Sequence, residues 1–310
     1  MSSQLTGSAS PAEQSSRMLA AGDYDAVFLP AQGMLGASLR YRGIEVLRHV
    51  EDLELAAAKG SAAGIPLLYP WANRLDGFHY SAAGKAVELD RASHLLHFDQ
   101  NGLPIHGVPW ARLAWSVTKA TDAMVVAHLD WDTPWQLSIF PFRHRVVMQV
   151  ILDDTGLTIE TTVIAGSESP VPISFGFHPY IGLPLPREQW QLTMPSMRRL
   201  VLDPHQIPTG NEETFGGFDA ALGEHDFDDG FALATDQSMF AIAGAGCRIN
   251  VELLAGYRFV QVYAPKGQSC IAVEPMTAPA NALVSGQGLQ VIPPHGRYRA
   301  AFRIAVTSSQ

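Results

Sequence analysis

Hydrophobic and polar residues alternate along several short stretches of the chain, and the clearest case is residues 145–164. In its second half, apolar Leu157, Ile159 and Val163 are interleaved with polar Thr158, Glu160 and Thr162. This two-residue period is typical of a strand with one buried face. The preceding Asp153-Asp154-Thr155-Gly156 is rich in residues that accept a left-handed backbone. The pattern therefore predicts a β-hairpin.

Similar short apolar runs cover most of the chain, and Cys247, Ile249, Val251 and Leu253 also alternate with polar neighbours. Further strands are predicted at 26–29, 34–41, 44–50, 114–118, 123–129, 189–193, 258–263, 269–274, 288–292 and 298–306. No long stretch has the 3.6-residue stripe and caps of a helix, and only short helical turns are expected, near 51–58 and 91–98. Many short strands separated by turn residues predict an all-β fold, a large antiparallel β-sandwich.

The distribution of low-complexity sequence suggests the domain organisation. Residues 1–17 are rich in Ser, Ala and Gln and are expected to form a flexible N-terminal leader. No internal repeat or Pro/Ser-rich linker interrupts the remainder of the chain, so we expect one β-sandwich domain over 18–306. Neither a signal peptide nor an apolar run of about 20 residues is visible. These features predict a soluble, cytoplasmic protein.

Charge and composition narrow the range of partners. The 310 residues are 47% hydrophobic and only 16% charged, with a formal net charge of −9 and no block of lysines or arginines. A nucleic-acid or anionic-membrane partner is therefore not expected, whereas a small neutral molecule such as a sugar is compatible. The two cysteines, Cys247 and Cys270, lie in apolar runs. Free buried thiols are favoured over a disulfide between them.

One apolar stretch, Val171 to Gly182, carries a single histidine, His178, followed by Pro179. The proline disfavours an α conformation at His178, so its imidazole is expected on extended backbone. A lone histidine here also fits an ordinary core residue. Other apolar stretches also contain polar residues, which suggests that several segments meet around a small polar ligand. This favours a functional role for His178 over that of an ordinary core residue.

Two of these segments carry charged side chains. Glu274 ends the apolar run that begins at Cys270, and partial desolvation there raises the pKa of a carboxyl group and makes it a stronger base. An exposed strand-end glutamate is the alternative. Asn73 and Arg74 lie between aromatic and aliphatic residues and can donate hydrogen bonds to sugar hydroxyls. Alternatively, Arg74 pairs with a surface acid such as Asp76.

Loop segments add weaker candidates. His106 precedes Gly107, which allows a ligand to approach closely. Asp226 to Phe231 is predicted to be an acidic turn in which either Asp228 or Asp229 could bind a hydroxyl pair. A simple solvated loop is the alternative, and by itself the turn favours that interpretation. His94 and His97 have the spacing of a loose metal pair, but no third ligand of definite spacing follows. We therefore expect neither a metal nor another cofactor.

Taken in order, these segments resemble the aldose 1-epimerase (galactose mutarotase-like) family. The matching motifs are Ala72-Asn73-Arg74-Leu75, the loop Asn101 to Gly107, His178-Pro179-Tyr180, Asp228 to Phe231, Val260-Gln261-Val262-Tyr263 and Glu274-Pro275. Each is short, but their shared order is specific. The loop lacks a second glycine after His106-Gly107, and Tyr69-Pro70-Trp71 replaces a glycine-arginine pair, so the two segments expected to contact the sugar depart from the family pattern.

The resemblance implies a very large β-sandwich and roles for individual residues. Glu274 would be the general base and His178 the general acid, assisted by His106 at the same end of the sugar. Substrate hydroxyls would be held by Arg74, Asp228 and Gln261, with Asn73 and Tyr180 as further contacts. The implied reaction interconverts the α and β anomers of an aldohexose without a cofactor.

Other functions remain open from the residues alone. A hexose-6-phosphate 1-epimerase needs an added cationic site, for which only Arg74, Arg143 and Arg145 are loosely placed candidates. A glycoside hydrolase or lyase would use Glu274 and Asp228 as a carboxylate pair. A non-catalytic carbohydrate-binding protein would stack sugars on Trp71 and Trp110. The sequence does not distinguish a monomer from a homodimer.

Overall fold

The longest stretch of alternating sequence forms the hairpin that it predicts. The computed structural model describes residues 16–48, 63–235, 237–244 and 246–308. Within it, β12 (His144–Asp153) and β13 (Gly156–Ala165) pair antiparallel along their whole length, with Asp153 opposite Gly156 at the turn. Along both strands, buried and half-buried positions alternate over most of the length.

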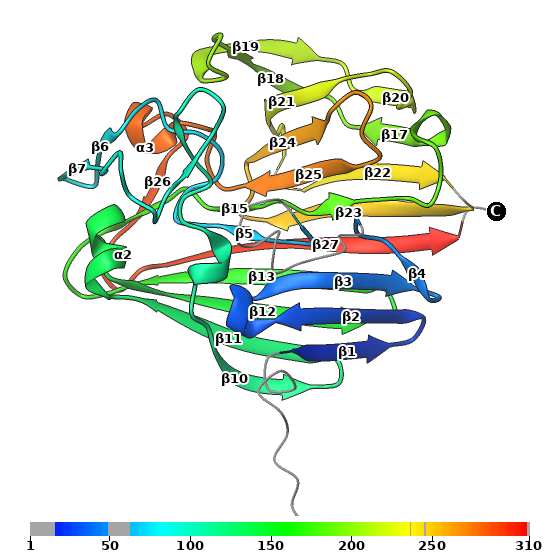
Figure 1. The fold of residues 1–310 in the computed structure, drawn as a ribbon, viewed down its shortest axis with the longest axis horizontal. Helices are drawn as coiled ribbons and strands as arrows, with labels where there is room; N and C mark the ends of the chain where they lie inside the picture. Colours follow the sequence, from blue (N-terminus) through cyan, green and yellow to red (C-terminus); the bar gives the residue numbers. More distant parts are fainter. Residues whose placement is uncertain (1–15, 49–62, 236, 245, 309–310) are drawn as a thin grey trace, which may run out of the picture.

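This hairpin belongs to a nine-stranded sheet among the described residues (Figure 1). The strands in spatial order are β10 (Ser116–Thr121), β11 (Met124–Trp131), β12, β13, β27 (Arg297–Ser308), β23 (Cys247–Ala255), β22 (Ser238–Gly244), β17 (Gln191–Met194) and β20 (Phe218–Ala221). Every named pair in it is antiparallel. The predicted strands near 114–118, 123–129, 189–193 and 298–306 all overlap its members.

A second, eight-stranded sheet carries the residues of chemical interest. Its strands in order are β19 (Pro208–Phe215), β18 (Met197–Leu202), β21 (Phe227–Ala232), β24 (Phe259–Ala264), β25 (Ile271–Met276), β15 (Gly176–Phe177) and β5 (Leu67–Leu68), with β16 (Tyr180–Ile181) also paired to β25. The predicted apolar strand at 171–182 is therefore divided into β14 (Val171–Ile173), β15 and β16.

Smaller sheets and helical turns complete the described chain. They are the four-stranded β1 (Arg17–Ala21), β2 (Tyr24–Leu29), β3 (Leu35–Tyr41) and β4 (Ile44–Glu45), and the pairs β6 (His79–Ala82) with β7 (Lys85–Glu88), β8 (His97–Phe98) with β9 (Pro104–Ile105), and β14 with β26 (Gln290–Ile292). The helical elements are α2 (Pro134–Ile139), α3 (Ala282–Ser285) and 3₁₀ turns at Pro30–Gln32, Trp110–Arg112 and Arg187–Gln189. Figure 1 shows α2, α3, β6 and β7 gathered at one end of the long strands.

The core lies between the two large sheets. Phe177 on β15 and Phe302 on β27 place their ring centroids 5.1 Å apart, and Tyr257 packs on the same Phe302 ring. Burial of such aromatic side chains supplies much of the hydrophobic stabilisation of a sandwich core. The all-β antiparallel sandwich predicted from the sequence is confirmed.

Several local predictions differ from the structure. Residues 91–98 form turns that lead into β8 rather than a helical turn, and the one expected near 51–58 lies outside the described residues, as do residues 1–15 of the predicted leader. Arg17, the last residue of that leader, begins β1. The short helix α2 was not predicted. Its signal is Thr133-Pro134 followed by Gln136, whose Oε1 accepts a hydrogen bond from the Thr133 N–H at 2.9 Å.

Candidate active site

Two cross-strand rows on the eight-stranded sheet bring the polar residues together. Gln261 on β24 lies opposite Gly230 on β21 and opposite Glu274 on β25. Two residues along β24, Tyr263 lies opposite Asp228 and Ala272, and Ala272 in turn lies opposite Tyr180 on β16. Because directly opposed and i, i+2 residues share a face, these side chains converge on one side of the sheet.

Gly230, in one of these rows, leaves room for the side chain of Gln261. A Cβ atom added to Gly230 would lie 3.1 Å from Oε1 of Gln261. With only hydrogen at this position, the Gln261 side chain remains in place, and its Nε2 donates a hydrogen bond to Oδ1 of Asp228 at 2.7 Å. The amide and the carboxylate therefore form one fixed polar pair.

Glu274 and His178 form the central ionisable pair. Oε1 of Glu274 lies 3.0 Å from Nε2 of His178, and their side chains are only 2% and 8% exposed. Burial raises the pKa of Glu274 well above its ordinary value, and the nearby Asp228 charge raises it further. Burial lowers the pKa of His178 well below its ordinary value. Because both charged forms are disfavoured, we expect one proton to be shared between the two side chains at neutral pH.

Tyr180 lies beside His178, and each member of the pair has one buried atom without a hydrogen-bond partner among the described residues. Tyr180 stacks on His178 with ring centroids 4.0 Å apart, and its hydroxyl oxygen lies 2.9 Å from Nε2. Oε2 of Glu274 and Nδ1 of His178 are buried and have no hydrogen-bond partner among the described residues. Unsatisfied buried polar atoms are rare, and a ligand hydroxyl is one group that can satisfy them.

His106 is held by a reciprocal contact with Asn73. Its backbone N–H donates to the Asn73 carbonyl at 2.9 Å, and the Asn73 N–H donates back to Nδ1 of His106 at 3.2 Å. Both residues have a left-handed backbone, with φ of 60° and 57°. Such strained positions in non-glycine residues cluster at functional sites.

This contact assigns the tautomer of His106. Because Nδ1 accepts a hydrogen bond, the proton of the neutral ring resides on Nε2, which can then donate. Burial, together with the charge of Arg74, lowers the pKa of His106 to about 3. His106 is therefore a neutral donor at physiological pH.

Arg74 is fixed by a carboxylate that we did not predict. Its Nε donates to Oδ2 of Asp99 at 2.8 Å, and its Nη1 donates to Oδ1 of Asn73 at 3.2 Å. The Arg74 and Asp99 side chains are 9% and 2% exposed. Asp76, the partner considered from the sequence, instead donates its backbone N–H to Asn281. Nη2 of Arg74 donates to no residue in the part of the chain that is described, so it can serve a ligand.

All eight candidate site residues line one cavity of about 360 Å³. They are Asn73, Arg74, His106, His178, Tyr180, Asp228, Gln261 and Glu274, and the lining also includes Gln100, Ile105 and Tyr263. Its size is near the lower end of the ~300–1,000 Å³ range of small-molecule sites. The cavity thus combines an acid–base pair with several fixed hydrogen-bonding groups.

The predicted acidic turn at 226–231 is wrong, because Phe227–Ala232 is strand β21, paired with both β18 and β24. Strand alternation separates the two aspartates. Asp228 faces the cavity, whereas Asp229 lies opposite Val262 and has Arg199 as its nearest cation, 3.9 Å away. Of the two carboxylates, only Asp228 is placed to meet a ligand.

Asp99 was missed by the sequence reasoning, although a signal exists. Its Oδ1 accepts backbone hydrogen bonds from Asn101 and Leu103 at 2.8 and 2.9 Å. An aspartate two residues before Asn-Gly is a common beginning of such a turn. The pattern identifies the turn, but it gives no indication that Asp99 also reaches Arg74.

Other features of the sequence have no part in this cavity. His94 and His97 belong to no group of three or more His, Cys, Asp or Glu side chains that could hold a metal ion, within the described residues. Both cysteines are free thiols, as predicted, but only Cys270 is buried, whereas Cys247 is half-buried. Trp71 is fully buried and offers no surface to a sugar.

No helix in the described part of the chain is long and apolar enough to cross a membrane.

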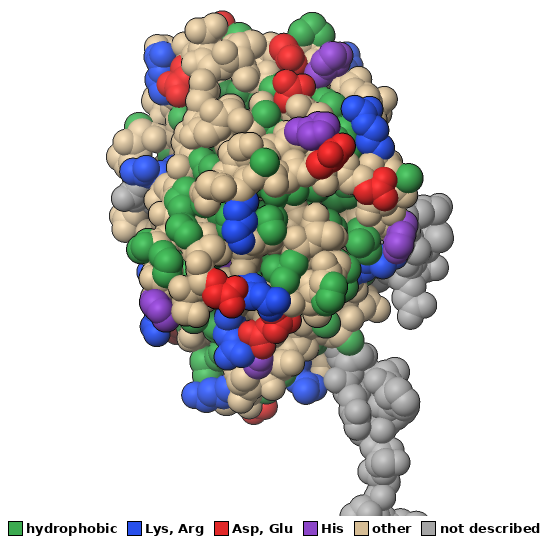
Figure 2. All heavy atoms as spheres, turned by 90° about the vertical axis from the view of Figure 1, so that its left-hand side faces the viewer, with side chains coloured by type: hydrophobic (Ala, Val, Ile, Leu, Met, Phe, Trp, Pro, Cys, Tyr) green, Lys and Arg blue, Asp and Glu red, His purple; other side chains and the backbone are tan. Residues whose placement is uncertain are grey.

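Charged residues are dispersed over the end of the molecule that carries the short helices (Figure 2). Figure 2, which faces the end with α2, α3, β6 and β7, shows acidic, basic and apolar side chains interspersed. Arg143 and Arg145, considered as phosphate ligands, do not line the cavity. Arg145 instead pairs with Asp130, and both side chains of this pair are about half exposed.

The fold and the cavity agree with a family comparison. The model of the aldose 1-epimerase family matches residues 35–305. The chain therefore belongs to the aldose 1-epimerase family, as its motifs indicated.

Individual relatives are distant. The protein YihR of Escherichia coli K12, described as uncharacterized, is 26% identical over 298 residues, which cover 92% of this chain and 91% of YihR. A galactose mutarotase-like protein from Clostridium acetobutylicum has a TM-score of 0.81 at 20% identity, with 94% of each chain covered. A GalM/aldose epimerase homologue from C. elegans has a TM-score of 0.78 at 16% identity, covering 95% of this chain and 99% of its own. At these identities the structures establish the shared fold.

Proposed function

We propose that this protein is an aldose 1-epimerase that interconverts the α and β anomers of an unphosphorylated aldohexose. The observation that carries the proposal is the contact between Glu274 and His178 at 3.0 Å within a polar cavity. Anomer exchange needs one proton to leave the C1 hydroxyl and another to reach the ring oxygen. Both oxygens are bonded to C1, so an acid and a base that lie close together are required.

The shared proton accounts for the catalytic cycle. With the proton on His178, Glu274 accepts the proton of the C1 hydroxyl while His178 protonates the ring oxygen. The bond between C1 and the ring oxygen breaks, and C1 becomes an aldehyde carbon. After rotation about C1–C2, both transfers reverse on the other face, which returns the proton to His178. Acid and base catalysis each contribute about 10²–10⁴ in rate.

The remaining side chains are suited to orientation of the sugar. Nε2–H of His106 and the free Nη2 of Arg74 are donors, and Asp228 accepts while Gln261 fixes its position. Held in one cavity, these groups limit the orientations of the substrate. Tyr180 and Asn73 line the same cavity and are proposed as further contacts.

The other candidate functions have less support. Hydrolysis by a carboxylate pair would use Asp228 together with Glu274. Asp228 is instead hydrogen-bonded to Gln261, and Glu274 contacts the imidazole of His178. A 6-phosphate would need cations, and Arg74, already paired with Asp99, is the one arginine or lysine among the described lining residues. The acid–base pair also favours catalysis over simple sugar binding.

Polarimetry of freshly dissolved α-D-glucose and α-D-galactose tests the proposal. We expect the wild-type protein to accelerate mutarotation and Glu274→Gln to lose at least about 100-fold of that rate. The matched control is Glu252→Gln on β23, a half-buried glutamate outside the cavity, which should keep the wild-type rate. Sugar binding without acceleration by the wild type would support a binding protein instead. Release of nitrophenol from nitrophenyl glycosides would support a hydrolase.

A further inference from the structure

A second cavity of about 280 Å³ adjoins the proposed active site. It shares Ile105, His106, His178 and Tyr180 with the first cavity. Its own walls are Pro66, Leu67, Leu68, His97, Phe98, Val108 and Trp110. The two spaces therefore meet along the two histidines, which line both.

The position of the catalytic pair fixes which end of a sugar faces this space. This step rests on the proposed function, in which Glu274 serves the C1 hydroxyl and His178 serves the ring oxygen. Glu274 lines only the first cavity, whereas His178 borders both. The ring oxygen joins C1 to C5. With C1 held at Glu274, the C5 side and its C6 substituent lie toward the second cavity.

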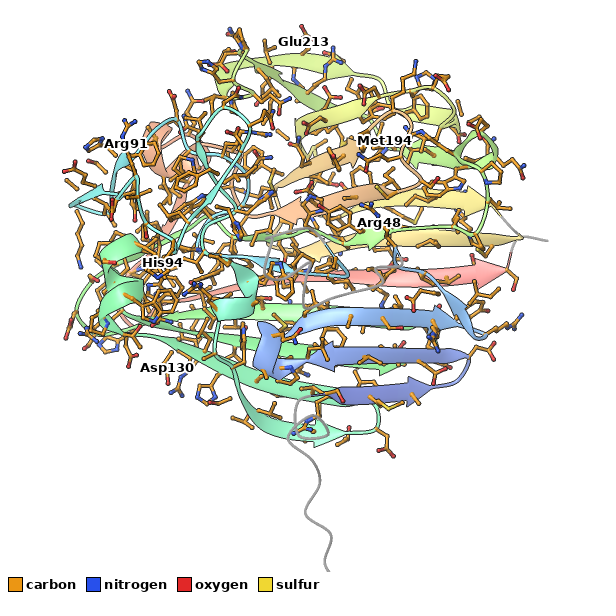
Figure 3. The ribbon with its side chains drawn as sticks, viewed as in Figure 1. Arg48, Arg91, His94, Asp130, Met194 and Glu213 are labelled. Carbon is orange, nitrogen blue, oxygen red and sulfur yellow. The ribbon has the colours of Figure 1, made fainter. Side chains whose placement is uncertain are left out.

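The walls of the second cavity are largely apolar and aromatic. Phe98 is 42% exposed at its rim, and its ring lies 6.0 Å from that of Phe78. Phe78 is covered in turn by the guanidinium of Arg91, labelled in Figure 3, with Cζ 4.3 Å from the ring centroid. Phe98 thus packs against a ring that is itself buried. An exposed, supported aromatic ring can pack on the C–H face of a sugar.

The polar groups of this cavity select against a charged substituent. No Asp, Glu, Lys or Arg occurs among its described lining residues. Burial and the charge of Arg112 lower the pKa of His97, so its imidazole is neutral at physiological pH. A phosphate would lose its hydration here without gaining a counter-ion. A neutral group with apolar faces and hydroxyls fits better.

We propose that the second cavity is a subsite for a neutral sugar unit carried on C6 of the aldose, so that the enzyme accepts reducing disaccharides with a 1→6 linkage. A 1→4-linked unit is attached at C4, next to C5, but its equatorial bond points directly away from C1 and not along the C5–C6 bond, so it is not directed into this cavity. The subsite predicts a preference for isomaltose over maltose, two disaccharides that differ only in the linkage position.

The test measures kcat/KM for anomer exchange of glucose, isomaltose and maltose by nuclear magnetic resonance. We expect isomaltose to exceed maltose by at least about fivefold, the contribution of one aromatic contact. Phe98→Ala should remove that advantage and leave glucose within about twofold. The control Met239→Ala removes a comparably exposed apolar side chain on β22 and should change none of the three.

Calorimetry with Glu274→Gln separates this inference from the proposed function. Tighter binding of isomaltose than of maltose, abolished by adding Phe98→Ala, supports the subsite even if wild-type protein proves inactive. Activity on glucose with equal kcat/KM and equal affinity for the two disaccharides would overturn the subsite and leave the epimerase intact. A Phe98→Ala variant that weakens glucose and isomaltose equally would also overturn it.

Discussion

Oε1 of Glu274 lies 3.0 Å from Nε2 of His178, although the two residues come from segments far apart in the sequence. The β16–β25 pairing, in which Tyr180 lies opposite Ala272, brings these segments together. A carboxyl group and an imidazole at this distance exchange a proton readily. Burial raises the pKa of Glu274 and lowers that of His178, so it disfavours the charged forms of both groups.

The pair predicts a bell-shaped pH profile for kcat/KM. Activity should fall in acid when the pair gains a second proton, and in base when it loses the shared one. Burial lowers the pKa of His178, so the acid limb should lie below about 6.5, its ordinary value. Burial raises the pKa of Glu274, so the basic limb should lie above about 4.3. An acid limb above about 6.5 would contradict the shared-proton pair.

Asp99→Asn should both destabilise the protein and weaken substrate binding. Arg74 would lose the charge that balances it in a buried position, at a cost of about 3 kcal/mol of unfolding free energy. Asp130→Asn is the matched control, because Asp130, labelled in Figure 3, pairs with Arg145 in solvent and should contribute about 0–1 kcal/mol. Denaturant titration measures both losses, and a KM for glucose unchanged in Asp99→Asn would contradict a role in positioning Arg74.

Stability should also depend on pH through Asp99. Burial by itself raises the pKa of this carboxyl group, but hydrogen bonds from the Leu103 N–H and from Arg74 outweigh burial and lower it overall. The stabilisation is therefore present above the unfolded-state pKa of about 3.9 and is lost as pH falls through the lower folded value. Asp99→Asn should flatten the stability curve over this acid range in denaturant titrations. Parallel curves for wild type and variant would contradict the assignment.

Asp228→Asn should raise KM by about tenfold, because a charge-assisted hydrogen bond to a hydroxyl contributes roughly 1.5–3 kcal/mol. The neighbouring Asp229→Asn serves as its control. Asp229 lies on the other side of β21, and its substitution should leave KM within about twofold. Initial-rate measurements on glucose distinguish the two. Equal effects would indicate that the strand register does not determine the sugar contact.

Gly107→Ala should disrupt the loop that holds His106. A Cβ atom there would lie 2.1 Å from the carbonyl oxygen of Tyr69, at a φ of 66°. The backbone must move, so we expect a loss of more than about tenfold in kcat/KM through misplacement of His106. Gly84→Ala provides the control, since its φ is 78° but nothing lies within 4 Å of the added atom. Gly84→Ala should lower the free energy of unfolding by only about 1 kcal/mol and leave the activity unchanged.

The sequence alone determined the fold class and the candidate residues. The alternation in 145–164 has one solution, a half-buried hairpin, because a two-residue period places every second side chain on the same face. The order of short motifs identified the family, and the motifs contain the eight candidate residues that line the cavity. These signals are local in the chain, so they can be read without knowledge of the three-dimensional structure.

The tertiary structure decided which of these residues meet. Asp226 to Phe231 has turn-like composition, but hydrogen bonding to β18 and β24 on both sides makes Phe227–Ala232 a strand. The register of this strand directs Asp228, and not Asp229, to the cavity. Asp99 reaches Arg74, and Phe98 reaches the second cavity, only through the packing of the loops around β8 and β9. Such contacts depend on strand register and loop packing between distant segments, and no local pattern in the sequence encodes them.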